Sequence, residues 1–303
     1  MRQFTEDTLT DAVVARLKGI KNPRFKQIMT SLIRHLHAFA KDVQLTEEEW
    51  FEGIKFLTAV GQKCDAKRQE FILLSDVLGL SMMTVAINHK TEPGATEATV
   101  LGPFYAHGAK EFGYGGDLRQ GASTKGEDVW VCGRVQSIDG KPIPGAILDI
   151  WQAKADGIYD VQVGDKFELR GRVKANDKGE YAFKSYKPKF YSIPVDGPVG
   201  DLIRATGNHH MRPAHMHAIV SAPGYQQVIT HLFVEGDPYL EEDAVFAVKD
   251  SLVVKYKKLP EAEAKKLGLP EKSLKLEHDF RLSPEKAGAK KARKKIAASD
   301  ALA

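Results

Sequence analysis

The chain has 303 residues, of which 43% are hydrophobic, and its formal net charge is +4. That length and composition predict one large or two ordinary globular domains. No stretch approaches the roughly 18 consecutive apolar residues of a membrane span, and the start of the chain, "MRQFTEDTLT", has no apolar signal segment. Cys64 and Cys132 lie too far apart in sequence to suggest a disulfide framework or a paired-thiol zinc motif. We therefore expect a cytoplasmic protein without a membrane span.

The first third of the chain has a helical pattern. Thr46 and Glu49 in "LTEEEW" match a capping box, which marks the start of a helix. The preceding segment, "FKQIMTSLIRHLHAFA" (25–40), has one apolar helical face, formed by Ile28, Leu32, Leu36 and Phe39. No obvious partner for this face stands in the chain, so we expect residues of about 20–90 to form a homodimer interface.

After residue 100 the pattern changes to short strands. Runs rich in β-branched and aromatic residues are separated by turn signals such as "IDGKPIPG" and "NDKG". The predicted strands are 128–137, 146–153, 166–173, 180–186, 215–221 and 227–236. This spacing predicts an antiparallel β-sandwich rather than a βαβ fold. The expected class is therefore α+β, with a helical dimerisation region (1–100), a β-sandwich catalytic domain (101–260) and a C-terminal extension (261–303).

The positive charge is concentrated at the C-terminus. Residues 285–303 hold six Lys or Arg and two Asp or Glu, a surplus that equals the net charge of the chain. Such a tail could contact nucleic acid or an anionic surface, but a disordered, solubilising tail is the favoured interpretation. No nucleic-acid partner is expected.

Two histidines in "RPAHMHAIV" (212–220) stand two positions apart. On a strand, His215 and His217 point to the same face, and their backbones lie about 7 Å apart, within reach of one metal ion. The motif alone does not establish a metal site, because paired histidines also occur as ordinary half-buried strand residues.

Two tyrosines strengthen the case for a metal. Tyr159 and Tyr191 stand in irregular stretches rich in Gly and Pro that flank predicted strands. Two imidazoles and two phenols, with no thiolate, suit hard ferric iron better than zinc. Each tyrosine could instead pack as an ordinary aromatic residue with its hydroxyl at the surface, and with nine tyrosines in the chain that alternative stays open.

The ordered set of tyrosines and histidines resembles the intradiol ring-cleavage dioxygenases. The resemblance covers about residues 20–258, and its matching stretches are "LGPFY" (101–105), "GKPIPGAILDIWQAKADGIYD" (140–160), "KGEYAFKS" (178–185), "YSIPVDGPVG" (191–200) and "RPAHMHAIVSAPGYQQVITHLFVEGDPYL" (212–240). It implies that Fe(3+) is held by Tyr159, Tyr191, His215 and His217. It also implies a helical dimer interface, with a phospholipid enclosed there, followed by a β-sandwich.

The resemblance implies an activity as well. Such an enzyme cleaves an aromatic ortho-diol between its hydroxylated carbons and inserts both atoms of O2. Tyr191 would serve as ligand and as base in turn, and Arg212 would stabilise charge that develops on the substrate. His231, in "VITHLFV", stands where catechol-cleaving relatives usually carry glutamine, and it completes the expected catalytic set.

The substrate is predicted from branch-like segments. "THLF", "YLEEDAVFAVKDSLV" (239–253) and "ILLSDVLGLSMMTVAINH" (72–89) resemble the hydroxyquinol-cleaving branch, so hydroxyquinol, giving maleylacetate, is favoured over catechol, giving cis,cis-muconate. Against it, an acidic residue is expected near position 85, where the chain has Val85. The implied ring pocket is apolar on its helical side and is lined by Met82, Val85, Gly102, Pro103 and Tyr105.

Two other classes of protein share part of this sequence pattern. A cupin-like metalloenzyme also uses an HxH motif on a β-scaffold, but the third histidine and glutamate that it needs do not follow "HMH" in a recognisable spacing. A non-catalytic β-sandwich binding module would explain the strands but not four potential ligands in family order.

Overall fold

The computed structural model describes residues 3–65, 68–90, 92–119, 121–164 and 166–285. The chain divides into two compact units, Met1–Gln62 and Lys63–Ala303. The predicted change from helices to strands near residue 100 lies within the second unit, where two further helices precede the sheets.

The first unit is helical. Its elements are α1 (Glu6–Ala15), the short 3-10 helix η1 (Arg16–Gly19), α2 (Pro23–Asp42) and α3 (Glu47–Lys63). Asn22 caps α2, because its Oδ1 accepts hydrogen bonds from the backbone amides of Arg24 and Phe25 at 3.0 and 3.1 Å. The predicted capping box forms at α3: Thr46 Oγ1 accepts from the Glu49 amide at 3.2 Å, and Glu49 Oε2 accepts from the Thr46 amide at 3.0 Å.

The predicted apolar face of α2 is exposed. Its four side chains have exposed fractions of 46–55%, and they are Ile28, Leu32, Leu36 and Phe39. Isolated apolar side chains at a surface are ordinary, but four on one helical face form a continuous patch.

The second unit begins with two short helices, α4 (Glu70–Val77) and α5 (Leu80–Asn88). Gly79 lies between them with a φ of 72°, a left-handed conformation that favours glycine. No single described helix is long and apolar enough to cross a membrane, although α4 and α5, bent by 78° at their junction, pass that test as a pair on length and composition alone.

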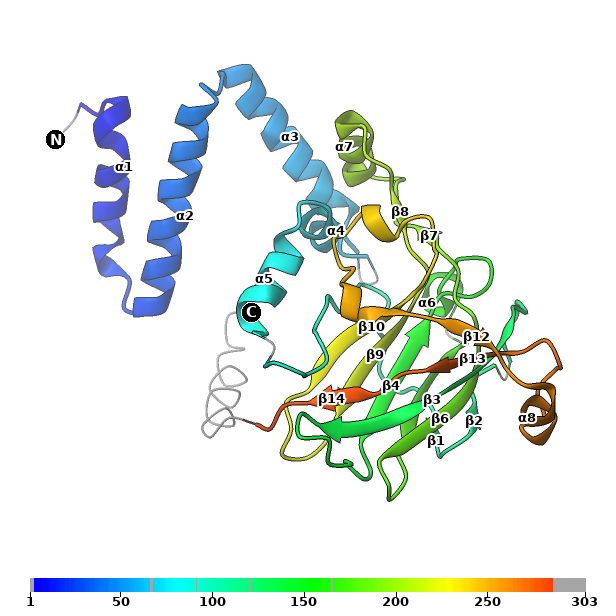
Figure 1. Ribbon diagram of the computed structural model, residues 1–303. Helices are drawn as coiled ribbons and strands as arrows, with labels where there is room; N and C mark the ends of the chain where they lie inside the picture. The colour runs from blue at the N-terminus through cyan, green and yellow to red at the C-terminus, as the bar shows by residue number, and fades with distance from the viewer. Residues whose placement is uncertain (1–2, 66–67, 91, 120, 165, 286–303) are drawn as a thin grey trace. The chain divides into compact units, whose positions relative to one another are not determined.

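Two six-stranded sheets follow and face each other (Figure 1). The first sheet has the order β1-β5-β4-β9-β10-β11, and its strands are Glu111–Phe112, Arg170–Lys174, Ile147–Gln152, His215–Ser221, Val228–Val234 and Val253–Val254. The second has the order β12-β13-β3-β6-β2, and its strands are Tyr256–Lys258, Leu274–Glu277, Asp128–Ser137, Glu180–Tyr186 and Gly116–Asp117. Strand β14 (Phe280–Leu282) pairs with β3 beside β13. The remaining elements are α6 (Asp160–Val163), β7 (Tyr191–Ser192), α7 (Pro198–Thr206), β8 (Met211–Arg212), η2 (Leu240–Glu242), η3 (Asp250–Leu252) and α8 (Glu261–Lys266).

The core lies between the two sheets. Leu148 and Met216 of the first sheet and Val131 and Phe183 of the second belong to one cluster of buried apolar residues. Along β9 the side chains alternate, so Met216 faces this core, whereas His215 and His217 face the other side of the sheet. The predicted β-sandwich is therefore confirmed, and its outer face carries the histidines.

The expectation of purely antiparallel sheets is corrected. The central pairs β4–β5, β4–β9, β9–β10 and β3–β6 are antiparallel, but β1–β5, β2–β6, β10–β11, β13–β3 and β14–β3 are parallel. Parallel pairing needs a long connection rather than a tight turn. Four of the five strands in these parallel pairs, β1, β2, β11 and β14, have only two or three residues, so alternation in the sequence does not reveal them.

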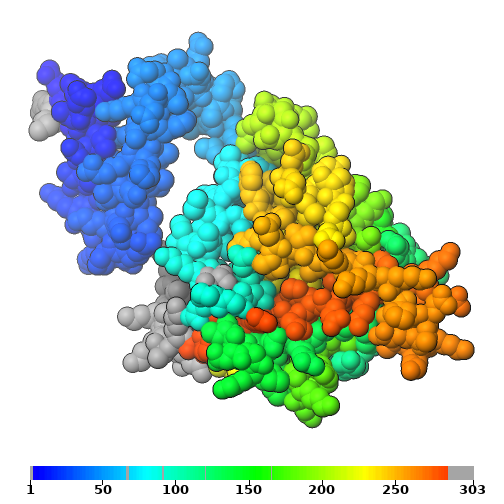
Figure 2. All heavy atoms as spheres, in the orientation of Figure 1, coloured from blue at the N-terminus to red at the C-terminus, as the bar shows by residue number. Residues whose placement is uncertain are grey.

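Strands β13 and β14 stand within the range 261–303, which was expected to be an extension. Leu276 of β13 and Phe280 of β14 are buried in the main core. Figure 2 shows this orange segment lying against the green strands of the same unit. The β-sandwich therefore continues past residue 260 to at least residue 282. Most of the basic tail, residues 286–303, lies outside the described residues.

Candidate active site

Three strands of the first sheet bring buried aromatic side chains together. His217 on β9 is the register partner of His231 on β10 and of Trp151 on β4. The indole of Trp151 stacks on the His217 ring with centroids 4.5 Å apart and an angle of 13° between the planes. His215, His217 and His231 are each at most 1% exposed. The HxH pair thus lies on the face away from the core, covered by other parts of the unit.

Three potential ligand atoms form a small triangle. Tyr159 Oη lies 2.9 Å from His217 Nε2 and 3.3 Å from His215 Nε2, and the two Nε2 atoms are 3.1 Å apart. A metal with bonds of about 2.0–2.2 Å to two ligands at right angles places those ligand atoms about 3 Å apart. The spacing of this triangle therefore fits one shared ion.

Tyr191 lies next to the triangle. Its ring centroid is 5.2 Å from that of Tyr159 and 5.6 Å from that of His215. Tyr159 stands directly before α6 and Tyr191 begins β7, so both come from the irregular stretches in which the sequence placed them. The structure thus brings together all four predicted ligands.

The ring nitrogens of His215 are distinguished by their surroundings. Its Nδ1 lies 2.7 Å from the carbonyl oxygen of Pro213, to which it donates, so Nε2 carries a lone pair. Burial, with a further contribution from Arg212, lowers the pKa of His215 to about 3. His215 is therefore neutral at neutral pH, the state in which imidazole binds a metal.

The other two members of the triangle are also neutral. Burial, followed by His231 and His215, places the pKa of His217 well below its ordinary value. Burial, followed by Tyr191, places the pKa of Tyr159 well above its ordinary value. A phenol in such a place loses its proton only when a cation is bound beside it, because a strong Lewis acid stabilises the phenolate directly. The donor set therefore suits a trivalent cation with a preference for phenolate oxygen.

A third imidazole stands beside the pair. One ring nitrogen from each of His215, His217 and His231 lies within 4.8 Å of the others. His231 Nδ1 is 2.5 Å from Thr99 Oγ1, and its Nε2 has no hydrogen-bond partner among the described residues. His231 therefore lies beside the HxH pair, and its catalytic role stays a prediction.

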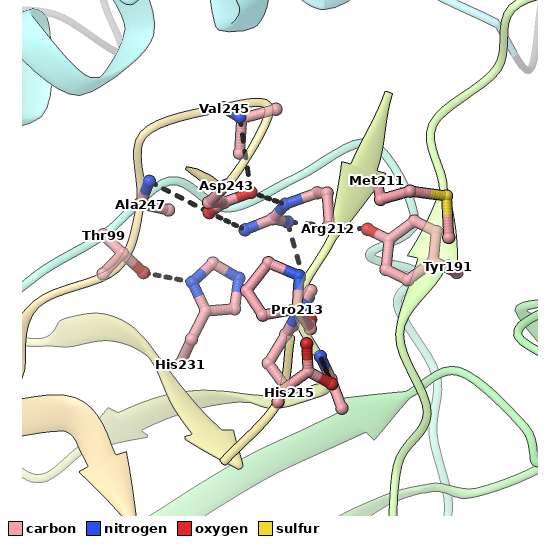
Figure 3. Close-up of polar contacts among 12 residues, drawn as sticks. Thr99, Tyr191, Met211, Arg212, Pro213, His215, His231, Asp243, Val245 and Ala247 are labelled. Carbon is pink, nitrogen blue, oxygen red and sulfur yellow. Dashed lines mark hydrogen bonds and ion pairs between the residues drawn. The ribbon is translucent and has the colours of Figure 1, made fainter. Parts of the chain in front are cut away.

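Arg212 is held by a carboxylate that the sequence did not identify. Its Nε and Nη2 donate to the two carboxylate oxygens of Asp243 at 2.9 and 3.1 Å, and its Nη1 lies 3.5 Å from Tyr191 Oη (Figure 3). Asp243 also accepts hydrogen bonds from the amides of Val245 and Ala247 at 3.3 and 3.1 Å. The guanidinium is thus fixed with one edge toward Tyr191.

The predicted pocket residue Gly102 contacts the site. It has a φ of 75°, and a Cβ there would lie 3.2 Å from His217 Cε1. Only glycine combines that backbone with so close an approach to the ring.

Tyr105, by contrast, points elsewhere. Its hydroxyl donates to Asp149 at 3.1 Å, and its ring meets Trp151 edge-on at 5.1 Å. Its neighbour Phe104 stacks on Tyr159 instead, with centroids 4.5 Å apart. Phe104, which the sequence analysis did not name, therefore lies against Tyr159, and the motif "LGPFY" was its only signal in the sequence. The assignment of Tyr105 to the ring pocket stays a prediction.

Three further predicted pocket residues lie outside these contacts. Val85 of α5 is partly buried and packs against the main core. Met82, on the same helix, is partly buried, and Pro103 is exposed. Their assignment to the pocket stays a prediction.

A buried acid lies on the helical side. Asp76 of α4 is 5% exposed, hydrogen-bonds to Ser81 and interacts electrostatically with Arg212 and Asp243. Burial raises its pKa. The hydroxyquinol-cleaving branch was expected to carry an acidic residue near position 85, where this chain has Val85, so the helical wall of the pocket was predicted to be apolar. The structure instead places a carboxyl group nine positions earlier in the chain.

Comparison with known proteins settles the family. A family model described as "Dioxygenase" matches residues 100–284, and one described as "Catechol dioxygenase N terminus" matches residues 22–96. The chain belongs to the intradiol ring-cleavage dioxygenases. It is 53% identical over 255 residues to 6-chlorohydroxyquinol 1,2-dioxygenase of Cupriavidus pinatubonensis. This alignment covers 84% of this chain and 92% of the relative. It is 46% identical to hydroxyquinol 1,2-dioxygenase of a Rhizobium species, over 92% of this chain and 96% of the relative.

Solved structures agree with this assignment. Hydroxyquinol 1,2-dioxygenase from Pseudomonas putida superposes with a TM-score of 0.86 at 47% identity, covering 92% of this chain and 99% of that one. Catechol 1,2-dioxygenase from Acinetobacter radioresistens gives a TM-score of 0.81 at 28% identity, covering 95% and 96%. The predicted enzyme class is confirmed, and the cupin-like and non-catalytic alternatives are overturned.

Proposed function

We propose that this intradiol dioxygenase cleaves hydroxyquinol between its two adjacent hydroxylated carbons, inserts both atoms of O2 and gives maleylacetate. The observation that carries the proposal is the triangle of Tyr159 Oη, His215 Nε2 and His217 Nε2, with sides of 2.9, 3.1 and 3.3 Å. The two enzymes from Cupriavidus and Rhizobium, which act on chlorohydroxyquinol and hydroxyquinol by name, support the substrate.

Iron(III) would be held by Tyr159, Tyr191, His215 and His217. Two phenolate oxygens and two neutral imidazoles form a hard donor set, which favours ferric iron over softer ions. Bound there, the metal would act as a Lewis acid toward both substrate oxygens and make the ring reactive toward O2.

The protein would manage the substrate's protons and charge. Tyr191 is the suitable proton acceptor, because its Oη faces the Arg212 guanidinium at 3.5 Å. Its phenolate would take a proton from a substrate hydroxyl held at this place. Arg212 would then face the negative charge left on the substrate. It carries its charge at every working pH, and Asp243 keeps it from moving.

Burial would exclude water from the reacting centre. The three histidines, Tyr159 and Arg212 are each at most 2% exposed. Charges interact more strongly in such a dry environment, and reactive ring-opened species are protected from side reactions.

Asp76 would select the substrate. Hydroxyquinol differs from catechol by one hydroxyl group, and a hydroxyl that enters a buried pocket needs a hydrogen-bond partner. Asp76 is a buried carboxyl group on the side of Arg212 and Asp243. It offers that partner from the helical side, where the sequence analysis expected only apolar residues.

The enzyme would act as a homodimer. The exposed apolar face of α2, formed by Ile28, Leu32, Leu36 and Phe39, supports pairing with the same face of a second copy. A phospholipid would share this apolar interface. Sedimentation velocity at micromolar concentration should show a dimer, and mass spectrometry of an organic extract should show the lipid. A monomer without lipid would contradict both.

Steady-state kinetics test the substrate. kcat/KM should be measured for hydroxyquinol and catechol with iron-loaded protein in oxygen-saturated buffer, and we expect a clear preference for hydroxyquinol. A preference for catechol would overturn the substrate but not the reaction class. No cleavage of either diol would overturn both.

A further inference from the structure

Three buried imidazoles surround one position in the site, and geometry alone allows all three to bind a metal. His215, His217 and His231 each offer a ring nitrogen within 4.8 Å of the others. Each neutral imidazole has one protonated nitrogen, which donates, and one bare nitrogen, which accepts or ligates. The groups next to the nitrogens therefore decide which rings are ligands.

Thr99 determines which ring nitrogen of His231 carries the proton. Its backbone amide donates to the carbonyl of Ile229 at 2.8 Å, and its side chain is buried, with 2% of the residue exposed. Thr99 Oγ1 lies 2.5 Å from His231 Nδ1. Among the described residues, this ring nitrogen is the one hydrogen-bond partner of the Thr99 hydroxyl. This position beside β10 fixes the hydroxyl against the ring (Figure 3).

The direction of that hydrogen bond follows from the number of donors. A buried hydroxyl brings one proton that needs an acceptor, and His231 Nδ1 is the acceptor within reach. If Nδ1 carried the ring proton instead, it would donate to Thr99 Oγ1 and the proton of the hydroxyl would have no acceptor. The favourable arrangement is therefore Thr99 O–H donating to a bare Nδ1.

We infer that Thr99 holds His231 as the tautomer with its proton on Nε2, so that His231 is a hydrogen-bond donor in the site and not a third metal ligand. A protonated Nε2 has no lone pair to offer a metal. His215 is the opposite case, because its Nδ1 donates to Pro213 at 2.7 Å and leaves Nε2 bare. Two chemically identical rings thus receive opposite roles from one hydroxyl and one carbonyl.

The Nε2–H donor of His231 is left without a partner in the part of the chain that the structure describes. His231 Nε2 is buried and has no hydrogen bond among the described residues. In Figure 3 the second ring nitrogen faces away from Thr99, toward the side of Arg212 and His215. Resting on the proposed function, we assign Nε2–H of His231 to an anionic oxygen of the bound diol. Thr99 is then a positioning residue that acts through His231.

The tautomer can be observed directly. The protein should be labelled with 15N-histidine and loaded with gallium(III), a diamagnetic stand-in for iron(III), and long-range 1H–15N spectra should be recorded. We expect a proton on Nε2 of His231, a bare Nδ1 and no shift caused by metal coordination. A proton on Nδ1, or coordination through either nitrogen, would overturn the inference even if the protein cleaves hydroxyquinol normally.

Two variants separate positioning from general damage. Thr99→Val removes the hydroxyl at nearly the same shape, and Thr99→Ser keeps it. We expect Thr99→Val to shift the His231 tautomer and to weaken anaerobic binding of hydroxyquinol, followed through the charge-transfer absorption, by about tenfold. Thr99→Ser should keep the wild-type tautomer. An unchanged tautomer in Thr99→Val would contradict the inference, and if that variant does not fold, the wild-type spectrum still decides. Failure of the proposed function would appear separately, as the absence of hydroxyquinol binding in the wild type.

Discussion

Arg212 and Asp243 form a bidentate ion pair that is buried on both sides. The two N–O distances are 2.9 and 3.1 Å, and the two side chains are 3% and 2% exposed. Asp243 raises the pKa of Arg212 against the opposing effect of burial, so the guanidinium keeps its charge. Burial raises the pKa of Asp243, but Arg212 outweighs it and the net shift is downward. The pair places a permanent positive charge beside Tyr191.

Asp243→Asn should damage both stability and catalysis. The substitution keeps the shape but leaves a buried guanidinium without its counter-charge, which costs about 3 kcal/mol or more of unfolding free energy. We expect kcat/KM for hydroxyquinol to fall by about 10- to 100-fold, because Arg212 loses its fixed position. Glu97→Gln is the control, since it breaks the more exposed pair with Lys249. Wild-type kcat/KM and Tm in Asp243→Asn would show that the pair has no such role.

Tyr159→Phe and Tyr191→Phe should each weaken the visible charge-transfer band of the iron-loaded protein. Each change removes one phenolate donor, and tyrosinate-to-iron(III) charge transfer gives the colour. Tyr256→Phe is the matched control, because this tyrosine also has a buried hydroxyl but belongs to β12 of the other sheet. Absorption spectra at equal iron content make the comparison. An unchanged band in either site variant would mean that the tyrosine in question is not a ligand.

His278 should make the fold sensitive to acid. Burial lowers its pKa to about 4, against a small opposing effect of Asp279, whereas in the unfolded chain the pKa is about 6.5. Between these values the unfolded state binds the extra proton, so stability falls as the pH falls from about 6.5 to about 4, by up to about 1.4 kcal/mol per pH unit. Urea unfolding of His278→Gln across this range should show a shallower dependence than wild type.

The exposed His35 provides the control for this experiment. His35→Gln removes an exposed histidine of α2 and therefore controls for the loss of a histidine as such. If His278→Gln and His35→Gln have the same slope as wild type, His278 does not contribute to acid sensitivity.

Asp76→Leu should change substrate preference. Removing the buried carboxyl group leaves the third hydroxyl of hydroxyquinol without its partner, so we expect kcat/KM for hydroxyquinol to fall by about tenfold or more. The value for catechol should change much less. Asp76→Asn, which keeps hydrogen-bonding capacity, should lie between Asp76→Leu and the wild type. An equal loss for both substrates would assign Asp76 a structural role instead.

Much of the fold could be predicted where local pattern and tertiary structure agree. Strands β3, β6 and β9 have the bounds predicted for them, 128–137, 180–186 and 215–221, because one face of each packs into the core and the residues alternate accordingly. The two-residue strands, such as β1 and β11, could not be predicted. Their pairing depends on a neighbouring strand and not on their own residues.

The residues of the site were likewise predictable only in part. The tyrosines and histidines carry a recognisable motif, whereas Asp76 and Asp243 resemble ordinary acidic residues of a helix and a loop. Only the folded structure buries these carboxylates and brings both near Arg212. Phe104 was missed for a related reason, since adjacent residues in an irregular segment point in different directions and the sequence does not say which one faces Tyr159.

The most direct test of the proposed reaction traces both atoms of O2 into the product. Iron-loaded protein should be supplied with hydroxyquinol under 18O2, with metal-free protein as the control for spontaneous oxidation, and the products should be analysed by mass spectrometry. The proposed reaction gives maleylacetate that carries both labelled oxygen atoms and forms only with the iron-loaded protein. A product cleaved beside the diol rather than within it, or no cleavage beyond the metal-free control, would contradict it.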